Sequence, residues 1–215
     1  MTKAKLAVLV SGRGTNLVAL VRAIDEGRCA AEIVLVASDN PGAPALEFAA
    51  SRGIPCAVVP FRKGADRAEF SAALAREVAA RAPDWVVMAG FMRVVTPEFV
   101  TPFEGRIVNI HPSLLPAFPG KDGVGDALAA GVRITGCTVH LVDLGVDSGP
   151  ILAQAAVPVL PGDTRETLHA RIQIREHELL PRVVDDLVRG RYRGATPIAD
   201  VEGEGDALVS PRFAT

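Results

Sequence analysis

An asparagine and a histidine two residues apart form the first pair of side chains that could do chemistry. Asn109 lies within the short apolar run 107–110 and His111 follows it directly, so on an extended chain the two side chains point the same way. This spacing puts an amide donor and an imidazole on one surface. Ligand sites of open α/β sheets lie beyond the carboxyl ends of strands. A lone histidine would be better explained as a satisfied strand-end residue, but the companion amide and the location favour function.

Two carboxylates, Asp143 and Asp147, lie in a glycine-containing loop between apolar runs. A carboxylate beside an imidazole stabilises the protonated ring and raises its pKa. Their spacing alone would make both of them ordinary turn residues. Our hypothesis is that one of them pairs with His111, which would complete an acid–base pair next to the amide of Asn109.

Residues 11–16, Ser-Gly-Arg-Gly-Thr-Asn, could bind an anion. They follow the first apolar run and open the first helical pattern. Two glycines let the backbone turn sharply and approach a ligand closely, and a helix N-terminus offers free N–H groups and a positive dipole end. The spacing is not G-x-G-x-x-G, and the lysine of a P-loop is absent. The competing interpretation is a structural turn with Thr15 as the N-cap of the helix.

Other polar residues are weaker candidates. His140 lies in an apolar run and is predicted to be a core residue or to support the site without touching substrate. His169 and His177 are eight residues apart on a helical pattern, without a carboxylate motif for a metal, and are predicted to be structural. Ser11 and Ser113 lack a G-x-S-x-G elbow, so a covalent serine mechanism is not expected.

The composition is that of a globular protein from a reducing compartment. The chain has 215 residues, of which 49% are apolar and 22% charged, and its net charge is −2. These values exclude disordered and collagen-like proteins and give no net basic footprint for nucleic acid. Cys29, Cys56 and Cys137 are far apart and odd in number, so neither a disulfide framework nor a zinc knuckle fits. The apolar run 6–10 is too short for a signal peptide, and no run is long enough to span a membrane. We therefore expect a cytoplasmic protein that binds neither membranes nor nucleic acid.

Short β-branched runs alternate with longer helical patterns in the first half of the chain. A helical stripe over 17–24 follows the first run, and a capping box formed by Asp66 and Glu69 opens a helix over 70–78. This alternation predicts a doubly wound α/β fold with a mostly parallel sheet. The predicted strands are residues 5–10, 32–38, 56–59, 85–89 and 107–110.

The second half predicts an antiparallel edge on this sheet. Runs 135–141 and 151–159 are strand-like and are joined by a glycine-rich turn without a helical segment. A long helix then extends from about residue 163 to 189, and Pro181 is expected to kink it or split it in two.

The chain shows no internal repeat and no linker, so one domain over 1–192 is predicted. Residues 193–215 are rich in glycine, proline and acidic side chains, and we expect them to form a loosely packed C-terminal tail.

Four stretches carry a resemblance to a known family. They are S-G-R-G-T-N-L at 11–17, G-F-M-R-V-V at 90–95, N-I-H-P-S-L-L-P at 109–116 and the run from Thr135 to Leu152. Together they resemble the folate-dependent formyltransferases. The opening G-T-N and the Q-x-R-E-H stretch at 173–177 are similar to the branch that acts on glycinamide ribonucleotide, the phosphoribosylglycinamide formyltransferases. The resemblance covers nearly the whole chain, to about residue 189.

The resemblance implies a reaction and a set of partners. A formyl group would pass from 10-formyltetrahydrofolate, a co-substrate, to the amine of 5-phosphoribosylglycinamide in de novo purine biosynthesis. The amine would attack directly through a tetrahedral intermediate, with no metal and no covalent enzyme intermediate. The partners would be small molecules, and the protein would be a monomer or a homodimer.

The resemblance also implies the site residues. Its catalytic positions match Asn109, His111 and Asp147. Its ribonucleotide-binding positions match Gly14, Thr15, Asn16, Gln173, Ile174, Arg175 and Glu176. Its folate-binding positions match Arg67, Met92, Arg93, Val94, Val95, Asn109, Asp143, Leu144, Gly145, Val146 and Asp147.

One stretch departs from the family pattern, because Val124 stands where members commonly carry a loop histidine. The glycines on either side of it predict added flexibility in the loop 120–125.

Alternatives from other classes stay open. Methionyl-tRNA formyltransferases usually carry a further basic C-terminal domain, and formyltetrahydrofolate deformylases an extra N-terminal domain; neither is expected here. A nicotinamide dehydrogenase could use Asp39, but the glycine spacing fails. A non-catalytic ligand-binding module is the non-enzyme option.

Overall fold

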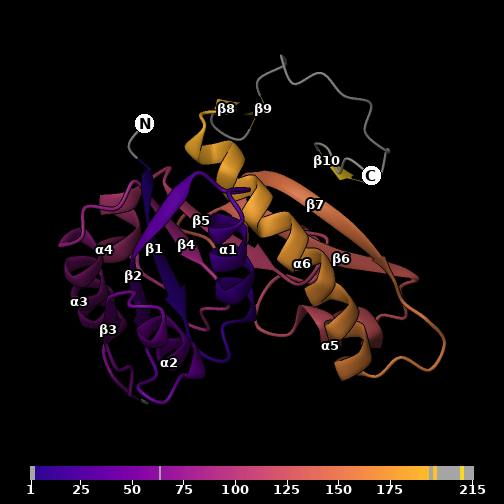
Figure 1. Ribbon diagram of the computed structural model, residues 1–215. Helices are drawn as coiled ribbons and strands as arrows, with labels where there is room; N and C mark the ends of the chain where they lie inside the picture. Colours follow the sequence, from indigo (N-terminus) through magenta and orange to yellow (C-terminus); the bar gives the residue numbers. More distant parts are fainter. Residues whose placement is uncertain (1–2, 63, 194–195, 198–208, 211–215) are drawn as a thin grey trace.

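A central sheet organises the molecule, which the computed structural model describes over residues 3–62, 64–193, 196–197 and 209–210. Within these residues the sheet has eight strands, in the order β10-β7-β6-β5-β4-β1-β2-β3 (Figure 1). The strands are β1 (Ala4–Val10), β2 (Ala31–Ser38), β3 (Cys56–Val58), β4 (Trp85–Met88), β5 (Ile107–His111), β6 (Ile134–Leu141), β7 (Ile151–Pro158) and β10 (Val209–Ser210). A separate antiparallel pair joins β8 (Tyr192–Arg193) and β9 (Thr196–Pro197).

Strand direction changes at β5. The strands β3, β2, β1, β4 and β5 are all parallel, whereas β6 runs antiparallel to β5, β7 to β6 and β10 to β7. The predicted fold is therefore confirmed: a doubly wound α/β sheet, parallel in its first half, with an antiparallel edge from the C-terminal half. Parallel strands end at the same edge of the sheet, so the segments after β1, β2, β4 and β5 meet there.

Helices cover both faces of the sheet (Figure 1). Alternate residues of β1 explain why, since Leu6, Val8 and Val10 belong to one buried cluster, whereas Ala7 and Leu9 belong to the other. The first cluster includes side chains of α1, α2, α5 and α6, and the second includes side chains of α3, α4 and η1. The helices are α1 (Thr15–Asp25), α2 (Pro44–Ser51), α3 (Arg67–Ala79), α4 (Pro97–Val100), η1 (Thr101–Phe103), α5 (Gly123–Ala129) and α6 (Arg165–Val188).

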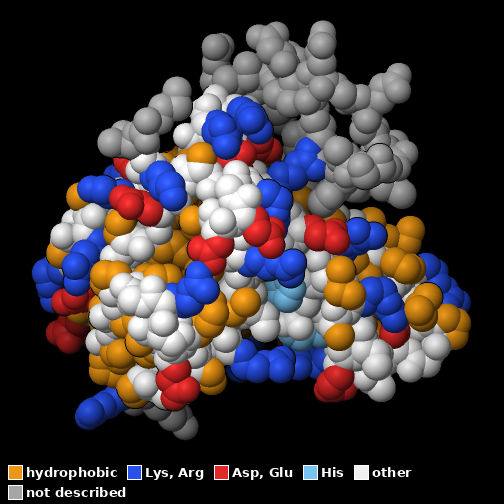
Figure 2. Space-filling view, viewed as in Figure 1, with side chains coloured by type: hydrophobic (Ala, Val, Ile, Leu, Met, Phe, Trp, Pro, Cys, Tyr) orange, Lys and Arg blue, Asp and Glu red, His pale blue; other side chains and the backbone are white. Residues whose placement is uncertain are grey.

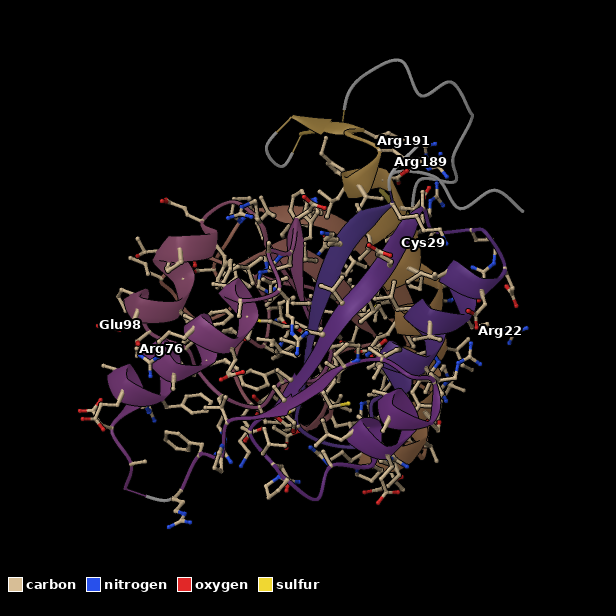
Figure 3. All side chains as sticks on the ribbon, turned by 60° about the vertical axis from the view of Figure 1, so that its left-hand side comes forward. Arg22, Cys29, Arg76, Glu98, Arg189 and Arg191 are labelled. Carbon is tan, nitrogen blue, oxygen red and sulfur yellow. The ribbon has the colours of Figure 1, made fainter. Side chains whose placement is uncertain are left out.

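The long helix α6 corrects one half of the prediction for Pro181, because this proline does not split the helix in two. The helix is continuous from Arg165 to Val188 with Pro181 inside it. Pro181 is buried together with Leu180 and Val183, and α6 packs against α1, β6 and β7. This packing compensates for the hydrogen bond that proline cannot donate. At the C-terminal end of α6, Arg189 and Arg191 gather around Asp185 (Figure 3).

Two predictions about local structure are also corrected. Thr15 does not cap α1, because it is the first helical residue and the N-cap is Gly14, in the left-handed region with φ 72°. The stretch 120–125 is not a flexible glycine loop, because Gly123, Val124 and Gly125 form the first turn of α5. The carboxylate of Asp122 caps that turn by accepting from the Gly125 N–H, and Val124 is buried in the core.

The division into a domain of 1–192 and a loosely packed tail of 193–215 stays a prediction. Most of the tail lies outside the described residues. Of the part that is described, β10 pairs with β7 through Val209 and Ser210. Among the described helices, none is long and apolar enough to cross a membrane.

Candidate active site

A cavity of about 290 Å³ opens at the carboxyl ends of β4 and β5. Its walls come from the segment after β4, the end of β5, Gly120 and Lys121 before α5, and the loop between β6 and β7. Many of the predicted site residues line it. They are Met92, Arg93, Val94, Val95, Asn109, His111, Asp143, Gly145, Val146 and Asp147.

An imidazole and a carboxylate face each other in this cavity. His111 Nδ1 lies 3.4 Å from Asp147 Oδ2, and both side chains are largely buried. The other ring nitrogen, His111 Nε2, lies 2.8 Å from the carbonyl oxygen of Phe118. A carbonyl only accepts, so Nε2 carries a hydrogen and donates it. Nδ1 is therefore the ring nitrogen that can exchange a proton at the cavity.

Asp147 is held by more than His111. The N–H of Gly120 donates to Oδ2 at 2.7 Å, and the amide of Asn109 lies 3.5 Å from Oδ1. Asp147 itself has a φ of 52°, and Phe118, the partner of His111, has a φ of 56°. Left-handed backbone at non-glycine residues costs energy and gathers at functional sites. Of the three described non-glycine residues with such a φ, two, Phe118 and Asp147, contact the His111 ring, and the third is Ala82.

His140 fixes the amide of Asn109 from behind. His140 Nδ1 lies 2.9 Å from the carbonyl oxygen of Leu141 and must donate to it. Burial lowers the pKa of His140, so its ring is neutral. Nε2 then carries a lone pair that accepts from Asn109 Nδ2 at 3.1 Å. The interaction orients the Asn109 amide nitrogen toward the cavity side that also holds Asp147.

A second polar cluster forms where α1 meets α6. Asn16 Nδ2 donates to Glu176 Oε2 at 3.0 Å, and Gln173 Nε2 donates to Thr15 Oγ1 at 3.4 Å. Burial raises the pKa of Glu176, and the hydrogen bond from Asn16 opposes that rise. Within the described part of the chain, Asn16 Oδ1 is buried without a hydrogen-bond partner. The structure thus brings Thr15 and Asn16 next to Gln173 and Glu176, which lie far from them in the sequence.

Some predicted site residues lie elsewhere. Arg67 begins α3 and does not line the cavity, and Leu144 is 69% exposed on the loop beside it. Ile174 is exposed on α6, and Arg175 pairs with Glu178 on the surface.

The two remaining histidines lie on α6 and are not part of the buried site. His169 and His177 are partly exposed, and histidine surface shows on the face that carries α1 and α6 (Figure 2). Among the described residues, no group of three or more His, Cys, Asp or Glu side chains could hold a metal ion.

Sequence reasoning missed the backbone partners of the site. The Phe118 carbonyl and the Gly120 N–H are backbone groups, which carry no side-chain signal in the sequence. The sequence also did not predict the contact between His140 and Asn109. This contact arises because the antiparallel register of β5 and β6 places the two residues opposite each other.

Residues 4–184 of the chain match a family model that is described as "Formyl transferase". The chain belongs to the formyl transferase family. Within this family it is 49% identical over 181 residues to the phosphoribosylglycinamide formyltransferase of Mycobacterium tuberculosis strain H37Rv, a match that covers 84% of this chain and 83% of the relative.

Further similarity reaches a longer protein and a solved structure. The chain is 45% identical over 196 residues to the trifunctional purine biosynthetic protein adenosine-3 of Drosophila pseudoobscura pseudoobscura, covering 90% of this chain but only 14% of that protein. It superposes with a TM-score of 0.86 on the crystal structure of glycinamide ribonucleotide transformylase 1 from Symbiobacterium toebii, at 44% identity, over 91% of this chain and 93% of that one.

Proposed function

We propose that this formyl transferase moves the formyl group of 10-formyltetrahydrofolate to the amine of 5-phosphoribosylglycinamide. The amine nitrogen attacks the formyl carbon, a tetrahedral intermediate forms, and the bond from that carbon to N10 of the folate breaks. The amine loses a proton and N10 gains one. The observation that carries the proposal is the convergence of Asn109, His111 and Asp147 on one cavity wall.

The chain is a one-carbon group transferase of purine biosynthesis, as its family and its relatives indicate. Its substrates are small molecules. The folate is a co-substrate in this family, and the residues proposed for the reaction require no metal. A cytoplasmic location and a monomeric or homodimeric state stay predictions.

Asn109 would stabilise the negative oxygen of the intermediate. One N–H of its amide is held by His140, and the other has only a long contact to Asp147 at 3.5 Å. That second N–H is free to turn to a formyl oxygen in the cavity. Removal of one such donor typically costs on the order of 10²–10³ in rate.

His111 and Asp147 would handle the proton. Because Nε2 is committed to the Phe118 carbonyl, His111 acts through Nδ1. The carboxylate of Asp147 lies 3.4 Å from Nδ1 and can accept a hydrogen bond from it. The protonated ring can donate to the developing oxyanion, and the pair can pass the proton of the amine to the leaving nitrogen, directly or through water.

The two substrates would occupy neighbouring sites. The cavity would hold the folate, because the exposed apolar side chains Met92, Val94 and Val146 gather on its lining and suit a flat ring system. The ribonucleotide would bind at the N-terminus of α1, where Gly14 and the following N–H groups suit a phosphate. The unpartnered Oδ1 of Asn16 would accept a hydrogen bond from its hydroxyl or amine groups.

A transfer assay tests this proposal. Purified protein is mixed with both substrates, and loss of 10-formyltetrahydrofolate is followed by absorbance. We expect loss only when the ribonucleotide is present, with formation of formylated product. Loss without the ribonucleotide would indicate hydrolysis instead, and binding of both ligands by titration without turnover would indicate a ligand-binding module.

A further inference from the structure

Asp39 is a buried acid that the proposed chemistry does not use. It follows β2 at the same sheet edge as the cavity, and its side chain is only 1% exposed. Both of its oxygens have strong partners. Ser11 Oγ donates to Oδ1 at 2.5 Å, and Arg93 Nε donates to Oδ2 at 2.5 Å. A buried carboxylate is costly unless it is paired and hydrogen-bonded, and here the partners come from two other loops.

Arg93 is locked by an aromatic group as well as by charge. Its guanidinium lies over the ring of Phe61, 5.0 Å from the centroid. The Phe61 N–H donates to the backbone carbonyl of Asp39. Phe61 packs edge-on against Phe70, which stacks on Phe91. The segment after β4 is therefore held at two points. Phe91 stacks on Phe70, and Arg93 contacts both the Phe61 ring and the Asp39 carboxylate.

Ser11 connects this segment to the first loop of the chain. Its hydroxyl donates to Asp39, which turns the oxygen lone pairs toward the Met92 N–H, and that N–H donates to Ser11 Oγ at 2.8 Å. The Ser11 N–H donates to the carbonyl of Gly90. Ser11 is also the first residue of 11–16, the loop proposed to bind the ribonucleotide.

We propose that Asp39 is a positioning residue that ties the cavity segment 90–95 to the loop 11–16, and so sets the two substrate sites relative to each other. The inference rests on the proposed function. Arg93 contacts Asp39 directly, and Met92 is linked to it through Ser11. The position of segment 90–95 therefore depends strongly on Asp39. The loop 11–16 has other anchors, since the Asn40 side chain donates to the Ser11 carbonyl and the Ala45 N–H to the Gly12 carbonyl.

The test is Asp39→Asn, with Asp25→Asn as the matched control. Asparagine keeps the shape but removes the negative charge that Arg93 pairs with. Its oxygen can still face Arg93 while its NH₂ group faces the Ser11 hydroxyl, which can accept, so the variant weakens the Arg93 pair and reverses the Ser11 hydrogen bond. Asp25 is an exposed acid paired with Arg52. We expect Asp39→Asn to raise the KM for the folate about tenfold or more, with a smaller change for the ribonucleotide, and to speed amide exchange of peptide 90–95 without substrates. Asp25→Asn should do neither.

Ser11→Ala keeps the proposal testable if Asp39→Asn does not fold. It removes the acceptor of the Met92 N–H but leaves the Arg93 pair, so it should raise the folate KM and the exchange of Met92 to a lesser extent. An unchanged folate KM and unchanged exchange in the variants would overturn the proposal. Equal rises in both KM values together with a lower Tm would also overturn it, because they indicate general loosening. If the wild-type chain shows no transfer activity, only the proposed function is rejected. Amide exchange of peptide 90–95 would still show whether Asp39 stabilises that segment.

Discussion

His111 Nδ1 lies 3.4 Å from Asp147 Oδ2, although one residue ends β5 and the other lies in the loop between β6 and β7. The hairpin-like return of β6 and β7 beside β5 makes this contact. The imidazole is fixed on its far side by the Phe118 carbonyl and the carboxylate by the Gly120 N–H. The pair is therefore preorganised before any substrate binds, which is what electrostatic stabilisation of an intermediate requires.

Replacing His140 with phenylalanine should lower kcat while changing either KM little. The change leaves the Asn109 amide without the acceptor that orients it. A lost buried hydrogen bond costs about 1–3 kcal/mol, or roughly fivefold to 150-fold in rate. His140→Gln offers another acceptor and should retain more activity. Steady-state kinetics of both variants test this. Equal kcat in His140→Phe and wild type would remove His140 from the account.

Replacing Glu176 with glutamine should stabilise the chain at high pH. Burial raises the pKa of Glu176 above its usual 4.5, so the folded chain holds this proton to a higher pH than the unfolded chain does. The stability linked to it is complete below pH 4.5 and is lost as the pH rises through the raised pKa. The Tm of Glu176→Gln minus that of wild type should thus grow with pH.

Thermal unfolding between pH 5 and pH 8 measures that difference. Glu178→Gln is the matched control, because Glu178 is an exposed acid of the same helix, and its Tm difference should stay nearly flat. A flat difference for Glu176→Gln as well would contradict the raised pKa. The same variant should bind the ribonucleotide more weakly, since the carboxylate next to Asn16 is proposed to contact it.

Gly14→Ala should weaken ribonucleotide binding and leave folate binding nearly intact. Gly14 has a φ of 72°, and a Cβ there would lie 2.5 Å from the Cβ of Ala45, so the loop has to move. Gly27 has the same φ with open space around it, and Gly27→Ala therefore reports the backbone strain alone, about 1–2 kcal/mol. Titration of each ligand and urea unfolding compare the two. If both variants bound the ribonucleotide equally well, the proposed anion site at residues 14–16 would be wrong.

Gly123→Ala should disturb the imidazole of the site. A Cβ on Gly123 would lie 2.9 Å from His111 Nε2 and 3.0 Å from the Phe118 carbonyl oxygen, so it would press on both partners of the hydrogen bond that fixes the ring. We expect a lower kcat, because the ring loses the contact that orients it, while both substrates still bind. Gly42→Ala is the control for stability, because Gly42 is exposed, has no left-handed φ, and an added Cβ would come no closer than 3.6 Å to another atom. An unchanged kcat would mean that the Phe118 contact does not orient the His111 ring.

The fold and much of the site could be predicted because their signals are local. Buried parallel strands appear in the sequence as apolar runs such as Leu6 to Val10. The end of the predicted strand 107–110 placed Asn109 and His111 at the edge of the sheet where ligands bind. Contacts set by tertiary packing could not be found this way. Pro181 is tolerated because α6 is packed along its length. Thr15 is not the N-cap of α1, because Gly14 adopts the left-handed conformation there and lies close to Ala45.

The carboxylate at Asp39 shows the same limit in a functional setting. In the sequence it resembled the acid of a dinucleotide site, but its partners Ser11 and Arg93 come from two other loops. Only the order β2-β1-β4 in the sheet brings these three residues to one place.

Single-turnover formyl transfer by His111→Ala and Asp147→Asn, compared with wild type and with Asp25→Asn, is the most direct test. With both substrates saturating, each site variant should lose on the order of 10²–10⁴ in rate while still binding 10-formyltetrahydrofolate and the ribonucleotide by titration. Transfer at the wild-type rate in either variant would contradict the assignment of this histidine–aspartate pair to the proton steps.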